Sequence, residues 1–175
     1  MKVLFFVTGV GYGDATREHA NIEALLARKP DAKVLIACYD NSYEYFKGKY
    51  RTLKIRGYRI PGSSMRFRVL PFVLNNLLLP FTWLFTAVKL KREIRKFNPD
   101  LIVSDFEPAG ITAAKLLGKK CIVIFGYNPE LLKEYTKTNK LSKKCWFEAR
   151  YFESLYDKAD FVIICISTGG FDSMK

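Results

Sequence analysis

Acidic side chains stand at two places in this sequence from which they could exchange protons with a substrate. Asp14 follows three alternating glycines, in the stretch GVGYGDATR that starts at Gly9. Asp105 and Glu107 follow a short apolar run. A carboxylate near another carboxylate can have its pKa raised, which suits a general base. The structural alternatives are a helix N-cap for Asp14 and a loop or cap acid for Asp105.

The glycine turn is itself a generic site for an anionic or polar group. Residues 3–8 form an apolar run typical of a buried strand, and a helix through Arg28 is expected after the turn. Glycine tolerates positive φ and lets another molecule approach the backbone. A helix N-terminus adds amide N–H groups and a positive dipole end. We therefore expect Gly11, Gly13 and Arg17 to position a substrate or its phosphate.

The same turn is a poor dinucleotide fingerprint. The pattern G-x-G-x-x-G needs a third glycine where this chain has Asp14, and that carboxylate would repel a pyrophosphate. Asp40 does end the second expected strand, where a ribose-binding acid would sit. The repulsion at Asp14 nevertheless disfavours NAD as a cofactor.

Short apolar runs alternate with helical segments along the chain. This pattern predicts an α/β fold: a Rossmann-like open parallel sheet of about six or seven strands with helices on both faces. Ligands of such sheets bind outside the carboxyl ends of the strands. Three loops, residues 9–17, 104–108 and 126–129, leave those ends and are expected to converge, with Glu107 and Asn128 lining the cleft. The expected strands are residues 3–8, 33–39, 53–60, 101–104, 121–125 and 161–166.

Residues 63–97 form a basic, hydrophobic insertion. Its stretch 69–88 carries no charge and is long enough to cross a membrane, but Pro71 and Pro80 interrupt it. Strands on both sides of the insertion belong to one sheet, which argues against a single crossing. Basic residues beside aromatics instead favour a segment lying in an anionic membrane interface. The residues expected to contact the membrane are Arg66, Arg68, Phe72, Leu74, Leu78 and Trp83.

The later part of the insertion is expected to pack partly on the sheet. Phe81, Leu84, Phe85 and Val88 share one helical face that could enter the core. The alternative for the whole segment is a helix buried on the sheet.

The charge balance suggests a polyanionic partner. The chain has 29 Lys and Arg against 17 Asp and Glu, a formal net charge of +12. Nucleic acid, an anionic membrane and a phosphorylated substrate all fit, as does a merely solvated basic surface. No nucleic-acid-binding module is recognisable, which disfavours the first. The 4 cysteines lack metal-ligand spacing, so we expect no metal site and reduced thiols in a cytosolic protein.

In these features the sequence resembles the N-terminal, acceptor-binding domain of GT-B-fold glycosyltransferases. The nearest groups are the lipid-linked N-acetylglucosaminyltransferase and the UDP-glycosyltransferases. The resemblance is carried by the glycine turn up to Arg17, by PDLIVSDF at residues 99–106, by the insertion, and by ADFV at 159–162. In many relatives the turn ends in a histidine that acts as or near the catalytic base. Asp14 has that position here, and Asp105 matches the acid that often supports the base.

The resemblance also implies what this chain would need from others. We expect a single domain over residues 1–175, without the C-terminal domain that holds the nucleotide-sugar. The implied donor, a UDP-sugar, would come through a donor-binding domain or separate catalytic subunit, and this domain would bind no cofactor. The implied place is the cytoplasmic face of a membrane, next to a lipid-linked or glycan acceptor. The alternative function is a non-catalytic, Rossmann-like scaffold that recruits a partner to the membrane.

Overall fold

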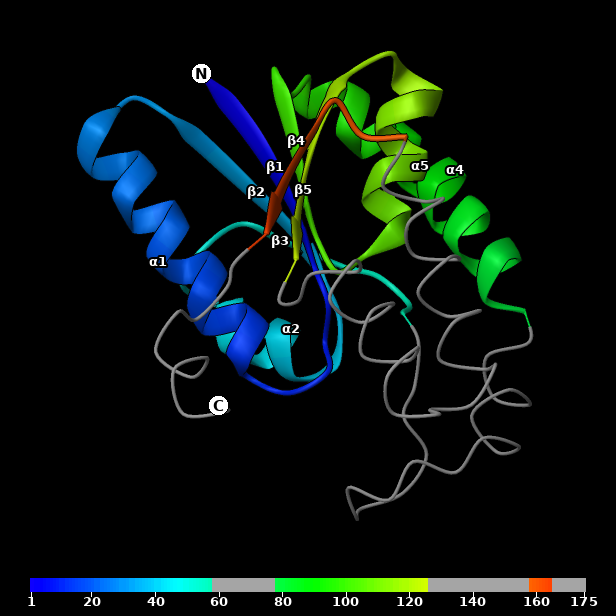
Figure 1. Ribbon diagram of the computed structural model, residues 1–175, viewed down its shortest axis with the longest axis horizontal. Coiled ribbons are helices and arrows are strands. Elements are labelled where there is room, and N and C mark those ends of the chain that lie inside the picture. The colour runs from blue at the N-terminus through cyan, green and yellow to red at the C-terminus, as the bar shows by residue number, and fades with distance from the viewer. Residues whose placement is uncertain (58–77, 126–157, 165–175) are drawn as a thin grey trace, which may run out of the picture.

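The computed structural model describes residues 1–57, 78–125 and 158–164 (Figure 1). Within them a single sheet of six parallel strands has the order β3-β2-β1-β4-β5-β6. This confirms the open parallel sheet. The strands are β1 (Lys2–Val7), β2 (Lys33–Cys38), β3 (Thr52–Lys54), β4 (Leu101–Asp105), β5 (Lys120–Phe125) and β6 (Phe161–Ile164).

Helices cover both faces of the sheet, as predicted. In Figure 1, α1 (Gly13–Arg28) and α2 (Asp40–Phe46) lie on one side, and α4 (Leu79–Phe97) and α5 (Pro108–Leu117) on the other. Successive side chains of a strand point to opposite faces. Phe5 of β1 accordingly packs in the cluster with Ile22 of α1, whereas Phe6 packs in the cluster with Ile94 of α4. The central strand thus has an apolar core on each side.

The strand order changes direction between β1 and β4. The chain winds outward from β1 through β2 to β3, then returns and adds β4 on the other side of β1. In open α/β sheets, ligands bind at such a point, in the crevice outside the carboxyl ends of the two strands. Val7 pairs with Asp105 there, and the Thr8 amide donates to the Asp105 carbonyl at 3.2 Å. The glycine turn and Asp105 are therefore neighbours.

Several element boundaries differ from the sequence expectation. β3 has three residues, and β2 ends at Cys38, so that Asp40 begins α2 instead of ending a strand. Asp14 does not cap α1: the N-cap is Tyr12, and Asp14 lies inside the first turn. A carboxylate there is still stabilised by the positive end of the helix dipole.

α4 packs on the sheet with a different face from the one expected. Trp83 is only 7% exposed and belongs to the core, so it is not a membrane contact. Phe81 and Phe85 are 70% and 68% exposed instead. The buried face carries no charge along the whole helix, through Leu90 and Ile94, whereas the Phe81 face leads into Lys89 and Arg92. Only the continuous face could cover the sheet without burying charge.

The cysteines that the structure describes are buried thiols, as predicted. Cys38 and Cys121 are free, and burial raises the pKa of each thiol to about 12. Cys145 and Cys165 lie outside the described residues.

Two glycines of the first turn are expected to respond differently to a Cβ atom. At Gly9 it would lie 2.3 Å from the Tyr39 carbonyl oxygen, whereas at Gly13 it would meet nothing within 4 Å. Gly9→Ala should therefore lower the free energy of unfolding by about 2–3 kcal/mol. Gly13→Ala, in the first turn of a helix, should change it by less than about 1 kcal/mol. Urea unfolding of both variants measures this, and equal effects would contradict the close approach of Tyr39.

Candidate functional site

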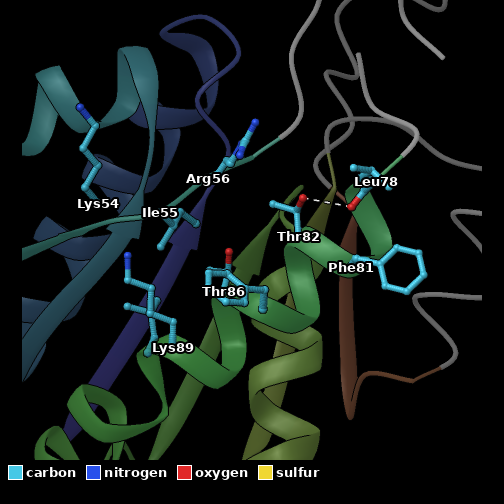
Figure 2. Close-up of a pocket in the computed structure, with 10 residues that line it drawn as sticks. Lys54, Ile55, Arg56, Leu78, Phe81, Thr82, Thr86 and Lys89 are labelled. Atoms are coloured by element: carbon cyan, nitrogen blue, oxygen red, sulfur yellow. Dashed lines mark hydrogen bonds between the residues drawn. The ribbon is translucent and has the colours of Figure 1, made fainter. Parts of the chain in front are cut away.

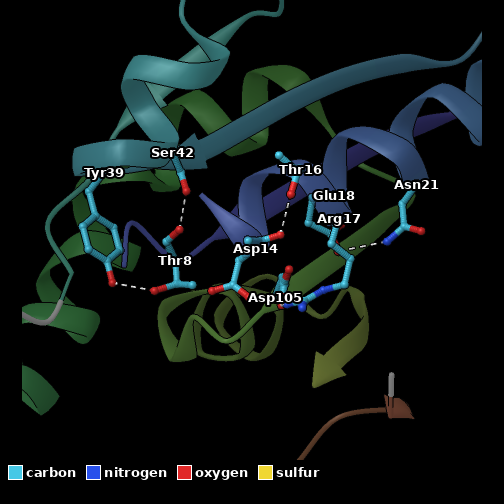
Figure 3. Close-up of polar contacts among 10 residues, drawn as sticks. Thr8, Asp14, Thr16, Arg17, Glu18, Asn21, Tyr39, Ser42 and Asp105 are labelled. Atoms are coloured by element: carbon cyan, nitrogen blue, oxygen red, sulfur yellow. Dashed lines mark hydrogen bonds and ion pairs between the residues drawn. The ribbon is translucent and has the colours of Figure 1, made fainter. Parts of the chain in front are cut away.

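An arginine joins the two acidic positions at the crevice. Nη2 of Arg17, on α1, is 2.5 Å from Asp14 Oδ1 and 2.6 Å from Asp105 Oδ1 (Figure 3). The structure thus brings together three of the residues expected from sequence, from two of the three loops. Asn128, in the third loop, lies outside the described residues.

The members of this cluster differ in their access to solvent. The side chain of Asp105 is 0% exposed, while those of Asp14 and Arg17 are 25% and 24% exposed. Asp105 is therefore shielded from solvent and contacts Arg17, and the catalytic role expected for it stays a prediction. The same nitrogen of Arg17 contacts both Asp14 and Asp105. Asp14 and Arg17 are the members of the cluster that a ligand can reach.

Local structure explains why Asp14 and Arg17 meet. α1 begins at Gly13, and residues three apart lie on the same face of a helix. Gly11 has a φ of 79°, which favours glycine, and it turns the chain from β1 into the helix. A Cβ at Gly11 or Gly13 would meet nothing within 4 Å, so the space above the turn is open. A ligand can approach the backbone there.

Glu18 is a further member of the cluster that the sequence analysis missed. It is 0% exposed, its Oε1 accepts a hydrogen bond from Asn21 Nδ2 at 3.0 Å, and its carboxyl group hydrogen-bonds that of Asp105. Burial raises the pKa of both carboxyls; Asp105 raises that of Glu18 further, whereas the hydrogen bond with Glu18 lowers that of Asp105. The helical spacing of the sequence could have indicated this burial. The inward face of α1 is formed by Ala15, Glu18 and Ile22, so an acid occupies a core position.

Glu107 belongs to a separate buried network. It is 1% exposed, and its Oε1 accepts from the Ala109 amide at 3.3 Å, which caps α5. Burial raises the pKa of Glu107 to about 8, against a hydrogen bond from Tyr39 that favours the carboxylate. The Tyr39 hydroxyl also lies 2.9 Å from Thr8 Oγ1. Glu107 thus caps α5 from a buried position, and its expected place beside a cleft stays a prediction.

A groove of about 770 Å³ opens beside the first turns of α4 (Figure 2). Its apolar wall includes Leu78 and Phe81, and its rim carries three cations, Lys54, Arg56 and Lys89. Lys54 ends β3, so the groove lies at the same carboxyl edge of the sheet as Asp105. An amphipathic, anionic molecule would suit such a lining.

The bridge is expected to stabilise the fold. Arg17→Met leaves the fully buried Asp105 without its cation, and removing one partner of a buried pair costs about 3–5 kcal/mol. Asp105→Asn, added to that variant, should recover part of the loss. Arg51→Met is the control, because it breaks an exposed pair with Glu93 at 3.3 Å and should cost less than about 1 kcal/mol. Denaturant unfolding compares them, and equal losses would refute the buried bridge.

Comparisons with known proteins agree with this architecture. A family model described as Glycosyl transferase family 1 matches residues 1–164. The solved MurG of Acinetobacter baumannii is 15% identical at a TM-score of 0.58, over 95% of this chain and 42% of that chain. UGT89C1 of Arabidopsis thaliana, complexed with UDP, is 15% identical at a TM-score of 0.61, over 94% of this chain and 45% of that chain.

A UDP-glucosyltransferase from Polygonum tinctorium, solved in a complex, is 13% identical at a TM-score of 0.59, over 96% of this chain and 46% of that chain. No curated protein matches the sequence. The chain thus spans less than half the length of these three solved structures. At such identities the likeness shows the fold, and the family model shows the family. The chain belongs to glycosyl transferase family 1 and has the Rossmann-like fold of a GT-B glycosyltransferase domain.

Proposed function

We propose that this chain is the acceptor-binding half of a glycosyltransferase and that Asp14 is its catalytic base. The observation that carries the proposal is the Asp14–Arg17–Asp105 cluster at the crevice between β1 and β4, in a chain of this family. The donor is a nucleotide-sugar, a UDP-sugar by analogy with the similar proteins. A donor-binding domain or a separate subunit holds it against the crevice.

The reaction assigns a proton transfer to Asp14. The acceptor hydroxyl oxygen bonds to the anomeric carbon of the donor sugar, and the nucleotide diphosphate leaves with the electron pair of the bond that breaks. Asp14 takes the hydroxyl proton as the new bond forms. Arg17 orients Asp14 through the contact between Nη2 of Arg17 and Oδ1 of Asp14. Inversion at the anomeric carbon follows when Asp14 and the leaving group lie on opposite sides of the sugar.

The acceptor that fits best carries a lipid and a phosphate. The groove beside α4 and the open glycine turn lie at the same edge of the sheet. Lys54, Arg56 and Lys89 suit a phosphate, and the apolar wall suits the start of a lipid chain. The sugar hydroxyl of such an acceptor would reach Asp14 over Gly11 and Gly13.

A peripheral position on the cytoplasmic face of an anionic membrane accounts for the exposed part of α4. Its apolar face, formed by Leu78, Phe81, Leu84, Phe85 and Val88, is 48–70% exposed. Exposed apolar surface of this kind marks an interaction site. In the described ranges, no helix has both the length and the hydrophobicity for a membrane crossing. Leu78 keeps its expected membrane contact in this proposal; Arg66, Arg68, Phe72 and Leu74 lie outside the described residues.

Replacing Asp14 by Asn tests the base. The amide keeps the shape but cannot accept the proton, so kcat for sugar transfer should fall about 100-fold or more. The assay uses the native assembly, isolated from its source through a tag on this chain, with radiolabelled UDP-sugars and membrane lipid as acceptor. Asp31→Asn, at an exposed turn, is the matched control and should keep the wild-type rate. An Asp14→Asn rate near that of the control would eliminate the base role.

Replacing the two exposed phenylalanines tests the membrane contact. Each Phe that enters the interface contributes about 1.5–3 kcal/mol, so Phe81→Ser/Phe85→Ser should weaken binding at least about tenfold. Co-flotation with phosphatidylglycerol-containing vesicles measures binding of the chain. Leu116→Ser, which removes a 42% exposed leucine from α5, should leave it unchanged. Undiminished flotation of the double variant would place the membrane contact elsewhere.

A further inference from the structure

A buried acid lies beneath the proposed base and has no part in the reaction as described. Glu18 is 0% exposed and sits one residue beyond Arg17 on α1 (Figure 3). One of its oxygens is bound by Asn21. Its other oxygen, Oε2, and Oδ2 of Asp105 are both buried without a donor facing them when both groups are ionised. Buried polar atoms rarely remain in that state.

A single proton between the two carboxyl groups would give both oxygens a hydrogen-bond partner. The two carboxyl groups hydrogen-bond each other, and two carboxylates can do so only when one of them is protonated. The charged groups that face this pair are Asp14 and Arg17, both from α1. With three ionised acids and one arginine the cluster would carry a net charge of −2, and one proton reduces it to −1. A partly buried site favours the smaller charge.

We propose that Glu18 is a positioning residue: it shares a proton with Asp105 and thereby keeps Arg17 engaged with Asp14. The shared proton holds Asp105 Oδ2, so that Oδ1 faces the arginine. Loss of the proton gives the Glu18–Asp105 pair a second negative charge, and the pair then competes with Asp14 for the guanidinium. The raised pKa values of both carboxyls, caused first by burial, agree with a proton retained at neutral pH. The importance of this arrangement for catalysis rests on the proposed function of Asp14 as the base. The shared proton itself does not depend on that function.

Infrared spectroscopy of the purified chain detects the proton directly. Glu107 is also expected to be protonated at neutral pH, because burial raises its pKa to about 8, so the measurement uses the Glu107→Gln background. That variant should show a C=O stretch of a buried carboxylic acid at pH 7. The band should disappear in Glu107→Gln/Glu18→Gln. Absence of the band in the first variant, or its persistence in the second, would overturn the shared proton.

The hold on Arg17 is read by nitrogen-15 NMR of its guanidinium, whose rotation is hindered while it bridges two carboxylates. The wild-type chain should lose the hindered signal as pH rises above 8. Glu18→Gln should keep it, because its amide N–H can donate to Asp105 at any pH. Glu18→Met, which cannot donate, should lack it throughout, and Glu23→Gln, at a 68% exposed position of α1, should behave as wild type.

A signal independent of pH in wild type, or identical in Glu18→Gln and Glu18→Met, would overturn the positioning role. Neither result depends on sugar transfer. The inference can therefore fail while Asp14 remains the base, and it can hold if the proposed function fails.

Discussion

The contact between Arg17 and Asp105 holds the candidate site together. It connects the first turn of α1 to the last residue of β4, across the crevice where the strand order changes direction. Asp105 is fully buried, so its charge requires a partner, and Arg17 is the cation that meets it. The same guanidinium holds Asp14 at the surface of the crevice. The arginine that pairs with the buried Asp105 thus also orients the partly exposed Asp14.

This arrangement divides roles among side chains of similar chemistry. Asp14, Glu18, Asp105 and Glu107 are all carboxylic acids near the carboxyl ends of β1 and β4. Burial separates them: Asp14 is partly exposed, while the other three are at most 1% exposed. Desolvation raises the pKa of the carboxyl groups of Glu18, Asp105 and Glu107, whereas Asp14 keeps contact with solvent. Environment, more than residue type, decides which acid can serve as a base.

The sheet was predictable because its strands are short apolar runs separated by helical segments, and parallel strands buried on both faces produce that pattern. The place of the cluster followed from the general rule for such sheets, which applies to Asp14 and Asp105 without any side-chain detail. Glu18 was missed because an acid on a helix is normally solvated. Only the inward positions of Ala15 and Ile22 reveal its burial.

The face of α4 was mispredicted for a related reason. The first turns of α4 are apolar on two sides, so the hydrophobic periodicity there fits burial of either face. Burial of one face buries Phe81 and exposes Trp83, and burial of the other does the reverse, as the structure shows. The capping role of Glu107 was equally open, because an acid before Pro108 can line a loop or accept from the helix behind it. Packing and local hydrogen bonds, which a sequence does not display, decide such cases.

The central claim is that an acceptor binds over the glycine turn, with Asp14 against its hydroxyl. Amide NMR of the chain, titrated with a sugar diphosphate on a short isoprenoid chain, tests it most directly. The account predicts saturable shifts at Gly11, Gly13, Asp14 and Arg17, together with shifts at the first turns of α4. Saturable shifts that spare the turn, or none at all, would contradict it.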